Sequence, residues 1–202
     1  YSFAQHKTVT VLDEPFYGYY LANANLKVEH PGTKEILEML PSSKKQVLDD
    51  INTLSKQGNY VFIKGMAHHY LSSEPSHILP WQNIILIRHP KKLLASFSKV
   101  IRNPTLDDIG IKKAAALFMY LKNQGNTPLV IDSDQLLENP ARYLQKICMI
   151  LGISFTKEML SWQKGGIEQD GIWAKYWYSN VHNSTGFEIQ KSSSQPMPNS
   201  LQ

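Results

Sequence analysis

Residues 84–96 read IILIRHPKKLLAS, and the fold class follows from this stretch. Four apolar residues end in Arg88, and Pro90 then stands where a helix begins, because proline suits the first helical position. The pattern predicts a strand that is buried on both faces and passes directly into a helix. Ligands of open α/β sheets bind at the carboxyl ends of strands, so Arg88 is a candidate anion-binding residue.

Three further runs share this apolar, largely β-branched or aromatic character: Thr8–Leu12 (TVTVL), Tyr60–Ile63 (YVFI) and Pro128–Ile131 (PLVI). Helical patterns lie between the runs, over residues 33–40, 44–56, 91–101 and 106–123, and from Asn139-Pro140 to Gly152. Strands that alternate with helices predict βαβ units. We therefore expect an α/β domain with a parallel sheet of about four strands flanked by helices, and 202 residues suffice for one such domain.

Composition narrows the function classes. The formal charge of +4, from 21 basic and 17 acidic residues, suits an anionic small ligand and is too small to indicate nucleic-acid binding. No apolar run approaches the roughly 20 residues of a membrane helix, so no membrane partner is expected. The single cysteine, Cys148, excludes an internal disulfide and favours a reducing, cytoplasmic compartment. Residues 188–202 are rich in Ser, Gln and Pro, which predicts a flexible tail or a linker to a fused downstream domain.

A phosphate-like anion is the ligand that the strand-to-helix junction favours. The guanidinium of Arg88 is a planar fork that matches phosphate, and the following helix N-terminus supplies backbone N–H groups. Ser96, eight residues after Arg88, adds a hydroxyl donor. The alternative interpretation is a surface arginine followed by an ordinary helical serine.

Three segments resemble the sulfotransferases: residues 87–100 (IRHPKKLLASFSKV), 130–155 (VIDSDQLLENPARYLQKICMILGISF) and 171–187 (GIWAKYWYSNVHNSTGF). More narrowly, they resemble the soluble sulfotransferase-like group that in plants is fused to an aminotransferase-like domain. The resemblance covers nearly all of residues 1–187. It implies a P-loop nucleotide hydrolase-like fold and 3′-phosphoadenosine 5′-phosphosulfate as co-substrate, with Arg88 and Ser96 on its 3′-phosphate. The implied acceptor is a small molecule with a hydroxyl or an amine.

Glu14 is the first candidate for a general base. It follows the strand Thr8–Leu12, and Pro15 disfavours helical geometry at Glu14. Sulfuryl transfer requires the acceptor to lose its proton, and a carboxylate at this edge of the sheet can accept that proton. The competing interpretation for Glu14 and its neighbour Asp13 is a loop carboxylate that accepts backbone hydrogen bonds, and Asp13 fits it better.

The segment KGMAHH, residues 64–69, follows the second apolar run and resembles the same sulfotransferase-like group. Lys64 is a candidate for stabilising charge on the transferring sulfuryl group. His69, and less favourably His68, is an alternative base or hydrogen-bond donor. The alternative is that both are polar loop residues. His68, His69, His77 and Glu74 match no recognised metal-binding spacing, so no metal is expected.

The C-terminal segment contains Lys164-Gly165 and Gly171-x-Trp173, similar to the basic loop that covers the 3′-phosphate in sulfotransferases. The resemblance implies that Lys164 contacts the co-substrate. Gln163 stands where the family carries an arginine. For Trp173, Trp177 and Tyr178 we expect packing or a wall of the acceptor pocket.

The chain contains neither G-x-x-x-x-G-K-[ST] nor G-x-G-x-x-G. The resemblance places residues 1–5 in the helix after the family's phosphosulfate loop, so residues 1–187 are expected to form a domain that is incomplete at its N-terminus and inactive alone. Two alternatives remain. One is a nucleotide kinase or hydrolase with Mg²⁺ on Asp132 or Asp13. The other is a non-catalytic binding module of a larger protein.

Overall fold

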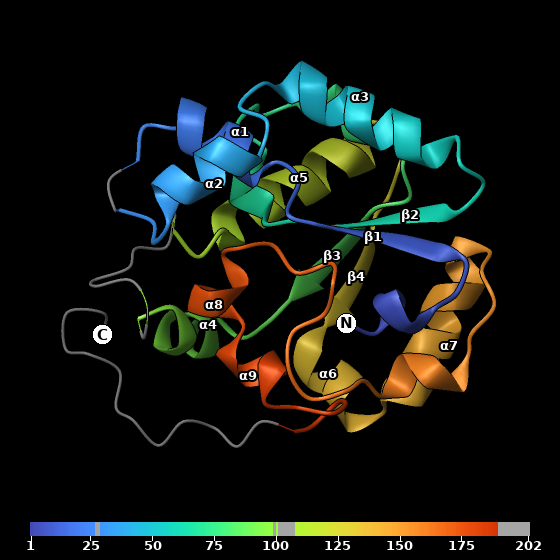
Figure 1. Cartoon of the computed structure of the whole chain (residues 1–202). Coiled ribbons are helices and arrows are strands. Elements are labelled where there is room, and N and C mark those ends of the chain that lie inside the picture. The colour runs from blue at the N-terminus through green and yellow to red at the C-terminus, as the bar shows by residue number, and fades with distance from the viewer. Residues whose placement is uncertain (27–28, 99, 101–107, 190–202) are drawn as a thin grey trace.

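The computed structural model describes residues 1–26, 29–98, 100 and 108–189 (Figure 1). The strands are β1 (Val9–Asp13), β2 (Tyr60–Lys64), β3 (Ile84–Ile87) and β4 (Leu129–Asp132). The α-helices are α1 (Tyr17–Asn23), α2 (Thr33–Met39), α3 (Lys44–Ser55), α4 (Pro90–Phe97), α5 (Ile111–Asn123), α6 (Ser133–Glu138), α7 (Pro140–Leu151), α8 (Ala174–Trp177) and α9 (Ser179–His182). Short 3₁₀ helices are η1 (Phe3–Gln5), η2 (Ala67–His69), η3 (Ser76–Ile78) and η4 (Lys157–Leu160).

The four apolar runs of the sequence are the four strands, and their pairing is parallel throughout, as predicted. β1 pairs with β2, with Asp13 opposite Lys64 at the carboxyl end. β3 pairs with β4, with Ile87 opposite Asp132. Within the part of the chain that the structure describes, the strands form two separate pairs rather than one continuous sheet.

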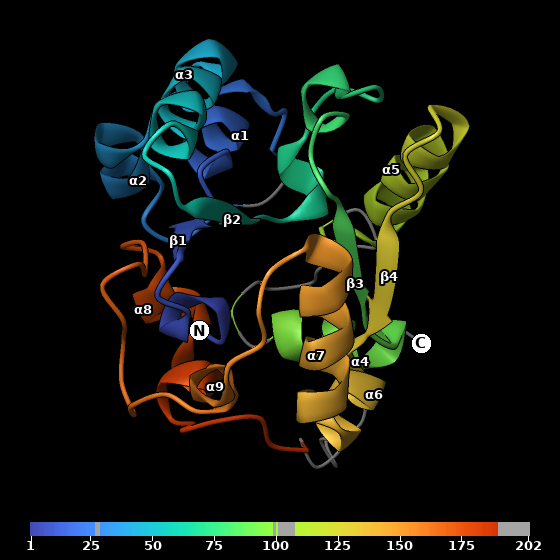
Figure 2. The same ribbon diagram turned by 90° about the vertical axis from the view of Figure 1, so that its right-hand side faces the viewer.

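The inner strands of the two pairs are β2 and β3, whereas β1 and β4 lie on the outer sides (Figure 2). Leu86 and Ile87 of β3 are 60% and 44% exposed, which is high for residues of an apolar parallel strand. Among the described residues, no further strand bonds to the inner sides of β2 and β3. The two pairs therefore leave strand edges of the kind that other strands add to.

Side-chain and backbone caps explain where the helices begin and end. Pro90 is the first residue of α4, and the preceding His89 accepts a hydrogen bond from the backbone of Lys91. Asn139 caps α7 by accepting from the Arg142 N–H at 3.1 Å. Gly152 ends α7 with φ of 70°, a left-handed conformation that favours glycine. The predicted continuation of α4 to Ile101 and the start of the next helix near 106 lie outside the described residues.

The core is divided among the layers. Leu144, Ile147 and Cys148 of α7 pack with Ile131 of β4 and cover one face of the β3–β4 pair. Val47 and Ile51 of α3 pack in the same way with the β1–β2 pair. Tyr17, Leu21 and Ile36 form a further cluster with Trp173, which brings the C-terminal segment against α1 and α2. This last contact places residues that are far apart in sequence beside the carboxyl end of β1.

The structure describes the surroundings of Cys148 but only the first two residues of the predicted C-terminal tail. Cys148 is buried, and burial raises the pKa of its thiol, which fits an inert core residue. Of the predicted tail, residues 190–202 lie outside the described part of the chain. No helix among the described residues has both the length and the apolar character needed to cross a bilayer.

Candidate functional site

Glu14 stands at the turn where β1 passes into α1. Its backbone N–H still donates to the Lys64 carbonyl at 2.7 Å, and its own carbonyl accepts from the Tyr17 N–H at 2.9 Å. Its φ is 46°, the one positive value outside glycine in the described residues. A left-handed non-glycine residue costs roughly 1–3 kcal/mol and persists where its surroundings hold it. The turn thereby directs a carboxylate to the carboxyl edge of the strand pair.

The Glu14 carboxylate forms an ion pair with Lys64. The Lys64 ammonium contacts Glu14 Oε1 directly and lies 3.4 Å from Asp13 Oδ1. Glu14 is only 6% exposed, whereas more than a third of the Lys64 side chain is accessible. A buried carboxylate requires such a partner, because an unpaired charge is costly away from water. The register that sets Asp13 opposite Lys64 brings the pair together.

The environment of Glu14 perturbs its acidity. Burial raises the pKa of the Glu14 carboxyl, and the nearby negative charge of Asp13 acts in the same direction. The ammonium of Lys64 opposes this shift by stabilising the carboxylate. A carboxylate with a raised pKa is a stronger base than an exposed one, which suits it to accept a proton.

The phenol of Tyr178 completes this cluster from the other end of the chain. Lys64 Nζ donates to the Tyr178 hydroxyl at 2.6 Å and lies 4.7 Å from the centre of its ring. The same hydroxyl lies 2.8 Å from Asp13 Oδ1 and 3.1 Å from Glu14 Oε1. The sequence predicts only packing or a pocket wall for Tyr178, so its polar role is a finding of the structure.

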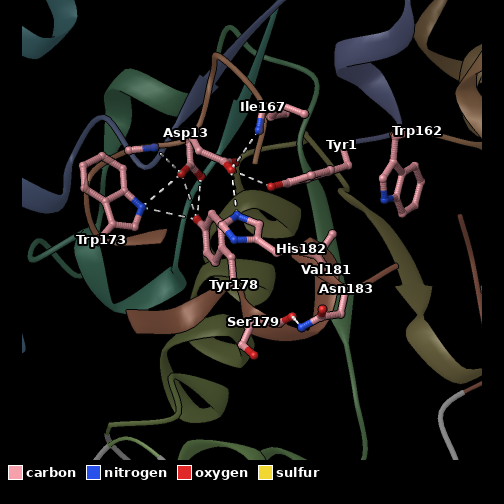
Figure 3. Close-up of polar contacts among 12 residues, drawn as sticks. Tyr1, Asp13, Trp162, Ile167, Trp173, Tyr178, Ser179, Val181, His182 and Asn183 are labelled. Atoms are coloured by element: carbon pink, nitrogen blue, oxygen red, sulfur yellow. Dashed lines mark hydrogen bonds and ion pairs between the residues drawn. The ribbon is translucent and has the colours of Figure 1, made fainter. Parts of the chain in front are cut away.

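Asp13 anchors the C-terminal segment. Its Oδ2 accepts from Trp173 Nε1 at 3.0 Å and from the Gly171 N–H at 3.3 Å, in addition to the contact with Tyr178 (Figure 3). This agrees with the expectation that Asp13 accepts backbone hydrogen bonds. A β-carbon at Gly171 would lie 2.0 Å from the Trp173 ring, so the Gly-x-Trp spacing has a steric reason.

His69 lies behind Glu14 and is 2% exposed. Its ring stacks on Tyr17 with centroids 4.7 Å apart, and its Nδ1 is 3.9 Å from Glu14 Oε2, too long for a hydrogen bond. Burial lowers the pKa of His69 well below its ordinary value and that of His68 to about 4, so both rings are neutral at pH 7. Neither Nδ1 has a hydrogen-bond partner among the described residues.

A hollow of about 340 Å³ opens beside His68 and is lined also by Tyr70, Leu71, Lys112, Lys113 and Ala116. Lys113 donates to the Ser72 carbonyl at 2.6 Å across this region. The imidazoles of His68 and His69 are 4.8 Å apart, and His69 in turn lies 3.9 Å from Glu14. Neither His69 nor Glu14 lines this hollow.

Arg88 occupies the predicted place directly after β3, and Ser96 lies in the second turn of α4. Both side chains are half-buried. Arg88 and Lys92 both act electrostatically on Asp134, and Lys92 bonds to that carboxylate at 2.7 Å. The positions at the carboxyl end of β3 are those expected from the sequence, and the shared role of Arg88 and Ser96 remains a prediction.

Lys164 is exposed on a loop that Asp170 holds in shape. Asp170 Oδ2 accepts from the Ile167 N–H at 3.1 Å, contacts His182 Nε2 at 2.9 Å and accepts from the Tyr1 hydroxyl (Figure 3). The loop is thus organised around one carboxylate. Lys164 as a contact to the co-substrate remains a prediction. The described residues contain no group of three or more His, Cys, Asp or Glu side chains suited to a metal ion.

Comparison with known proteins identifies the class. A family described as "Sulfotransferase domain" matches residues 1–200, so the chain belongs to the sulfotransferase-domain family. Two Arabidopsis thaliana proteins, branched-chain-amino-acid aminotransferase-like proteins 2 and 1, are each 34% identical over 199 residues. The match covers 98% of this chain and 35% of each relative, so the chain spans about a third of their length.

Two solved structures share the fold. The sulfotransferase domain from the curacin biosynthetic pathway superposes with a TM-score of 0.52 at 14% identity, covering 96% of this chain and 94% of that one. The sulfotransferase domain from the Synechococcus PCC 7002 olefin synthase gives 0.55 at 16% identity, covering 98% and 92%. The α/β fold of the sulfotransferase domains, with its P-loop-like architecture, is therefore confirmed for this chain.

The anchoring role of Asp13 yields a test. In Asp13→Ala, the Gly171 amide loses its acceptor and Trp173 Nε1 keeps only the longer contact to the Tyr178 hydroxyl at 3.3 Å, so local opening of residues 171–178 becomes more frequent. We expect hydrogen–deuterium exchange of these amides to accelerate about tenfold or more, measured by mass spectrometry on the full-length protein. Asp50→Ala, an exposed change on α3, is the matched control. Unchanged exchange in Asp13→Ala would show that the segment is held by other contacts.

Proposed function

We propose that this domain transfers a sulfuryl group from 3′-phosphoadenosine 5′-phosphosulfate to a hydroxyl or amine of a small-molecule acceptor. The observation that supports it best is the buried Glu14 paired with Lys64 at the carboxyl ends of adjacent parallel strands. Ligands of α/β sheets bind at this edge, and membership of the sulfotransferase-domain family gives the reaction class. A cytoplasmic location is proposed with it, on the single cysteine.

The proposed chemistry uses three residues. The acceptor oxygen or nitrogen attacks sulfur, the bond from sulfur to the bridging oxygen of the 5′-phosphate breaks, and Glu14 takes the acceptor proton. Lys64, which contacts Glu14, is assigned to stabilise the negative charge that develops on the transferring group. The neutral His69, 3.9 Å from Glu14, is the alternative base. Adenosine 3′,5′-bisphosphate is the leaving product.

The donor's 3′-phosphate is assigned to Arg88, Ser96 and Lys164. Arg88 lies at the carboxyl end of β3 beside the N-terminus of the eight-residue helix α4, which presents the positive end of the helix dipole. The N–H groups of Lys91, Lys92 and Leu93 donate to His89 in this structure. The Lys164 loop is held by Asp170, as its role over the phosphate requires. No acidic residue occurs in the first turn of α4, so this helix end suits an anion.

We also propose that residues 1–202 carry only part of the donor site and are inactive as a fragment. The inner edges of β2 and β3 are the support, because among the described residues no strand pairs with them and a parallel strand with a phosphate loop at its end would pair with such edges. The residues encoded immediately before Tyr1 test this idea. An apolar run followed by a Gly/Ser/Thr-rich loop is expected there, and its absence would count against both the missing strand and the donor.

Two other functions predict different ligands. A nucleotide kinase or hydrolase needs Mg²⁺ on a strand-end carboxylate. Asp132 Oδ1 instead accepts hydrogen bonds from the Asp134 and Gln135 N–H groups, and Asp13 Oδ2 accepts one from Trp173 of the C-terminal segment. A non-catalytic module needs neither nucleotide. Titration calorimetry on the full-length protein separates the three, with adenosine 3′,5′-bisphosphate binding expected. Binding of ATP with Mg²⁺ alone, or of neither ligand, would contradict the proposal.

Glu14→Gln tests the base. The amide keeps the size of the side chain but accepts no proton, so kcat/KM falls about 100-fold or more while binding of adenosine 3′,5′-bisphosphate is unchanged. In the native protein, kcat/KM rises with pH as Glu14 loses its proton. Because the pKa of Glu14 is raised, this rise occurs above the ordinary glutamate pKa of about 4.3, and it is absent in Glu14→Gln. If Glu14→Gln kept both the native kcat/KM and its rise with pH, the role of base would pass to His69.

Arg88→Met tests the phosphate site. Charge-assisted hydrogen bonds contribute about 1.5–3 kcal/mol, so affinity for adenosine 3′,5′-bisphosphate falls about 10- to 100-fold in calorimetry. Affinity for adenosine 5′-phosphate, which lacks the 3′-phosphate, changes little. Arg142→Met on the exposed side of α7 is the control. An equal loss for both nucleotides would place Arg88 elsewhere than on the 3′-phosphate.

A further inference from the structure

One hydroxyl of this chain already lies where the proposed reaction needs its nucleophile. The Tyr178 oxygen is 3.1 Å from Glu14 Oε1 and 2.6 Å from Lys64 Nζ. These are hydrogen-bond distances to the proposed base and to the proposed charge-stabilising cation. An acceptor hydroxyl must contact the same two groups, so Tyr178 occupies that position in this structure.

The surroundings of Tyr178 differ from those of a purely structural tyrosine. Its hydroxyl carries one proton, yet three carboxylate oxygens lie within hydrogen-bond distance, from Asp13 and Glu14. Burial and both carboxylates raise the pKa of the phenol, so the hydroxyl keeps its proton unless a base takes it. Its ring is half-buried, and the residue lies between α8 and α9, each of four residues.

The segment around Tyr178 is attached both in the core and at the site, since Trp173 packs with Tyr17, Leu21 and Ile36 and Lys175 pairs with Glu35 at 2.7 Å. At the site, the Asp13 carboxylate accepts hydrogen bonds from Gly171, Trp173 and Tyr178 (Figure 3). Glu14 Oε1 lies 3.1 Å from the Tyr178 hydroxyl. Ser179 and Asn180, directly after Tyr178, are exposed. The hydroxyl is thus presented to Glu14 and Lys64 by a segment that the buried Trp173 side chain fixes in the core and the Asp13 carboxylate fixes at the site.

We propose that Tyr178 is an intramolecular acceptor, sulfated on its hydroxyl by the domain's own transfer activity. This inference rests on the proposed function. The phenolic oxygen forms a bond to the sulfur of 3′-phosphoadenosine 5′-phosphosulfate, and the bond from sulfur to the 5′-phosphate oxygen breaks. Glu14 takes the phenolic proton, and adenosine 3′,5′-bisphosphate leaves with the electron pair.

The product changes the charge balance of the cluster. A sulfate ester carries a permanent negative charge and has no hydroxyl proton to donate. The carboxylates of Asp13 and Glu14 therefore repel it. Lys64 alone then faces three anionic groups. Sulfation of Tyr178 therefore weakens the anchoring of residues 171–178 and frees the acceptor position for another molecule.

The full-length protein is incubated with the ³⁵S-labelled donor and no added acceptor. We expect label to approach one sulfate per chain, and electron-transfer mass spectrometry to place it on Tyr178 in the tryptic peptide that follows Lys175. Tyr178→Phe loses at least about nine-tenths of the label, and Glu14→Gln slows labelling about tenfold or more. Tyr176→Phe, two residues away on the same peptide, retains full labelling.

The outcomes separate this inference from the function on which it rests. A protein that binds adenosine 3′,5′-bisphosphate and sulfates an added phenol, but leaves Tyr178 unlabelled or labels another residue, overturns the inference alone. A protein that neither binds this nucleotide nor transfers sulfate overturns both. Localising the label in the native protein decides the matter even where Tyr178→Phe fails to fold.

Discussion

The ion pair between Lys64 and Glu14 joins the ends of β1 and β2, and the arrangement of the site depends on it. Glu14 is buried in a strained left-handed turn, where an unpaired carboxylate is unfavourable. The ammonium compensates that charge and also donates to Tyr178. One cation therefore stabilises the turn, holds the candidate base as a carboxylate and positions a hydroxyl beside it.

Adjacent carboxylates take different roles because the chain turns between them. Asp13 ends the strand and accepts hydrogen bonds from the segment that carries Gly171 and Trp173, so it serves architecture. Glu14, one residue on, is directed into the buried cluster with Lys64 and His69. The raised pKa of Glu14 follows from this burial, and the same neighbourhood keeps His69 neutral. A carboxylate that anchors the C-terminal segment and a buried carboxylate that is paired with Lys64 are thus separated by one peptide unit.

Family and fold restrict the chemistry more than they restrict the substrate. The chain belongs to the sulfotransferase-domain family, and solved sulfotransferase domains at 14% and 16% identity share its fold. The curated relatives extend well beyond this region, which is about a third of their length. Because unrelated acceptors are served by the same fold, the argument for function has to come from the residues at the carboxyl edge. Those residues are Glu14 as the candidate base, Lys64 as a cation beside it, and Arg88 at the end of β3.

Local patterns predicted the strands, the start of α4 at Pro90 and the cap of α7 at Asn139, because burial periodicity and capping act over a few residues. They also placed Glu14, Lys64 and Arg88 at strand ends. The local patterns do not predict that the strands form two pairs or that Tyr178 contacts Lys64. Each of these features depends on contacts between distant segments. Tyr178 is 114 residues from Lys64, and only the folded C-terminal segment, held by Asp13, brings its hydroxyl to Lys64 and Glu14.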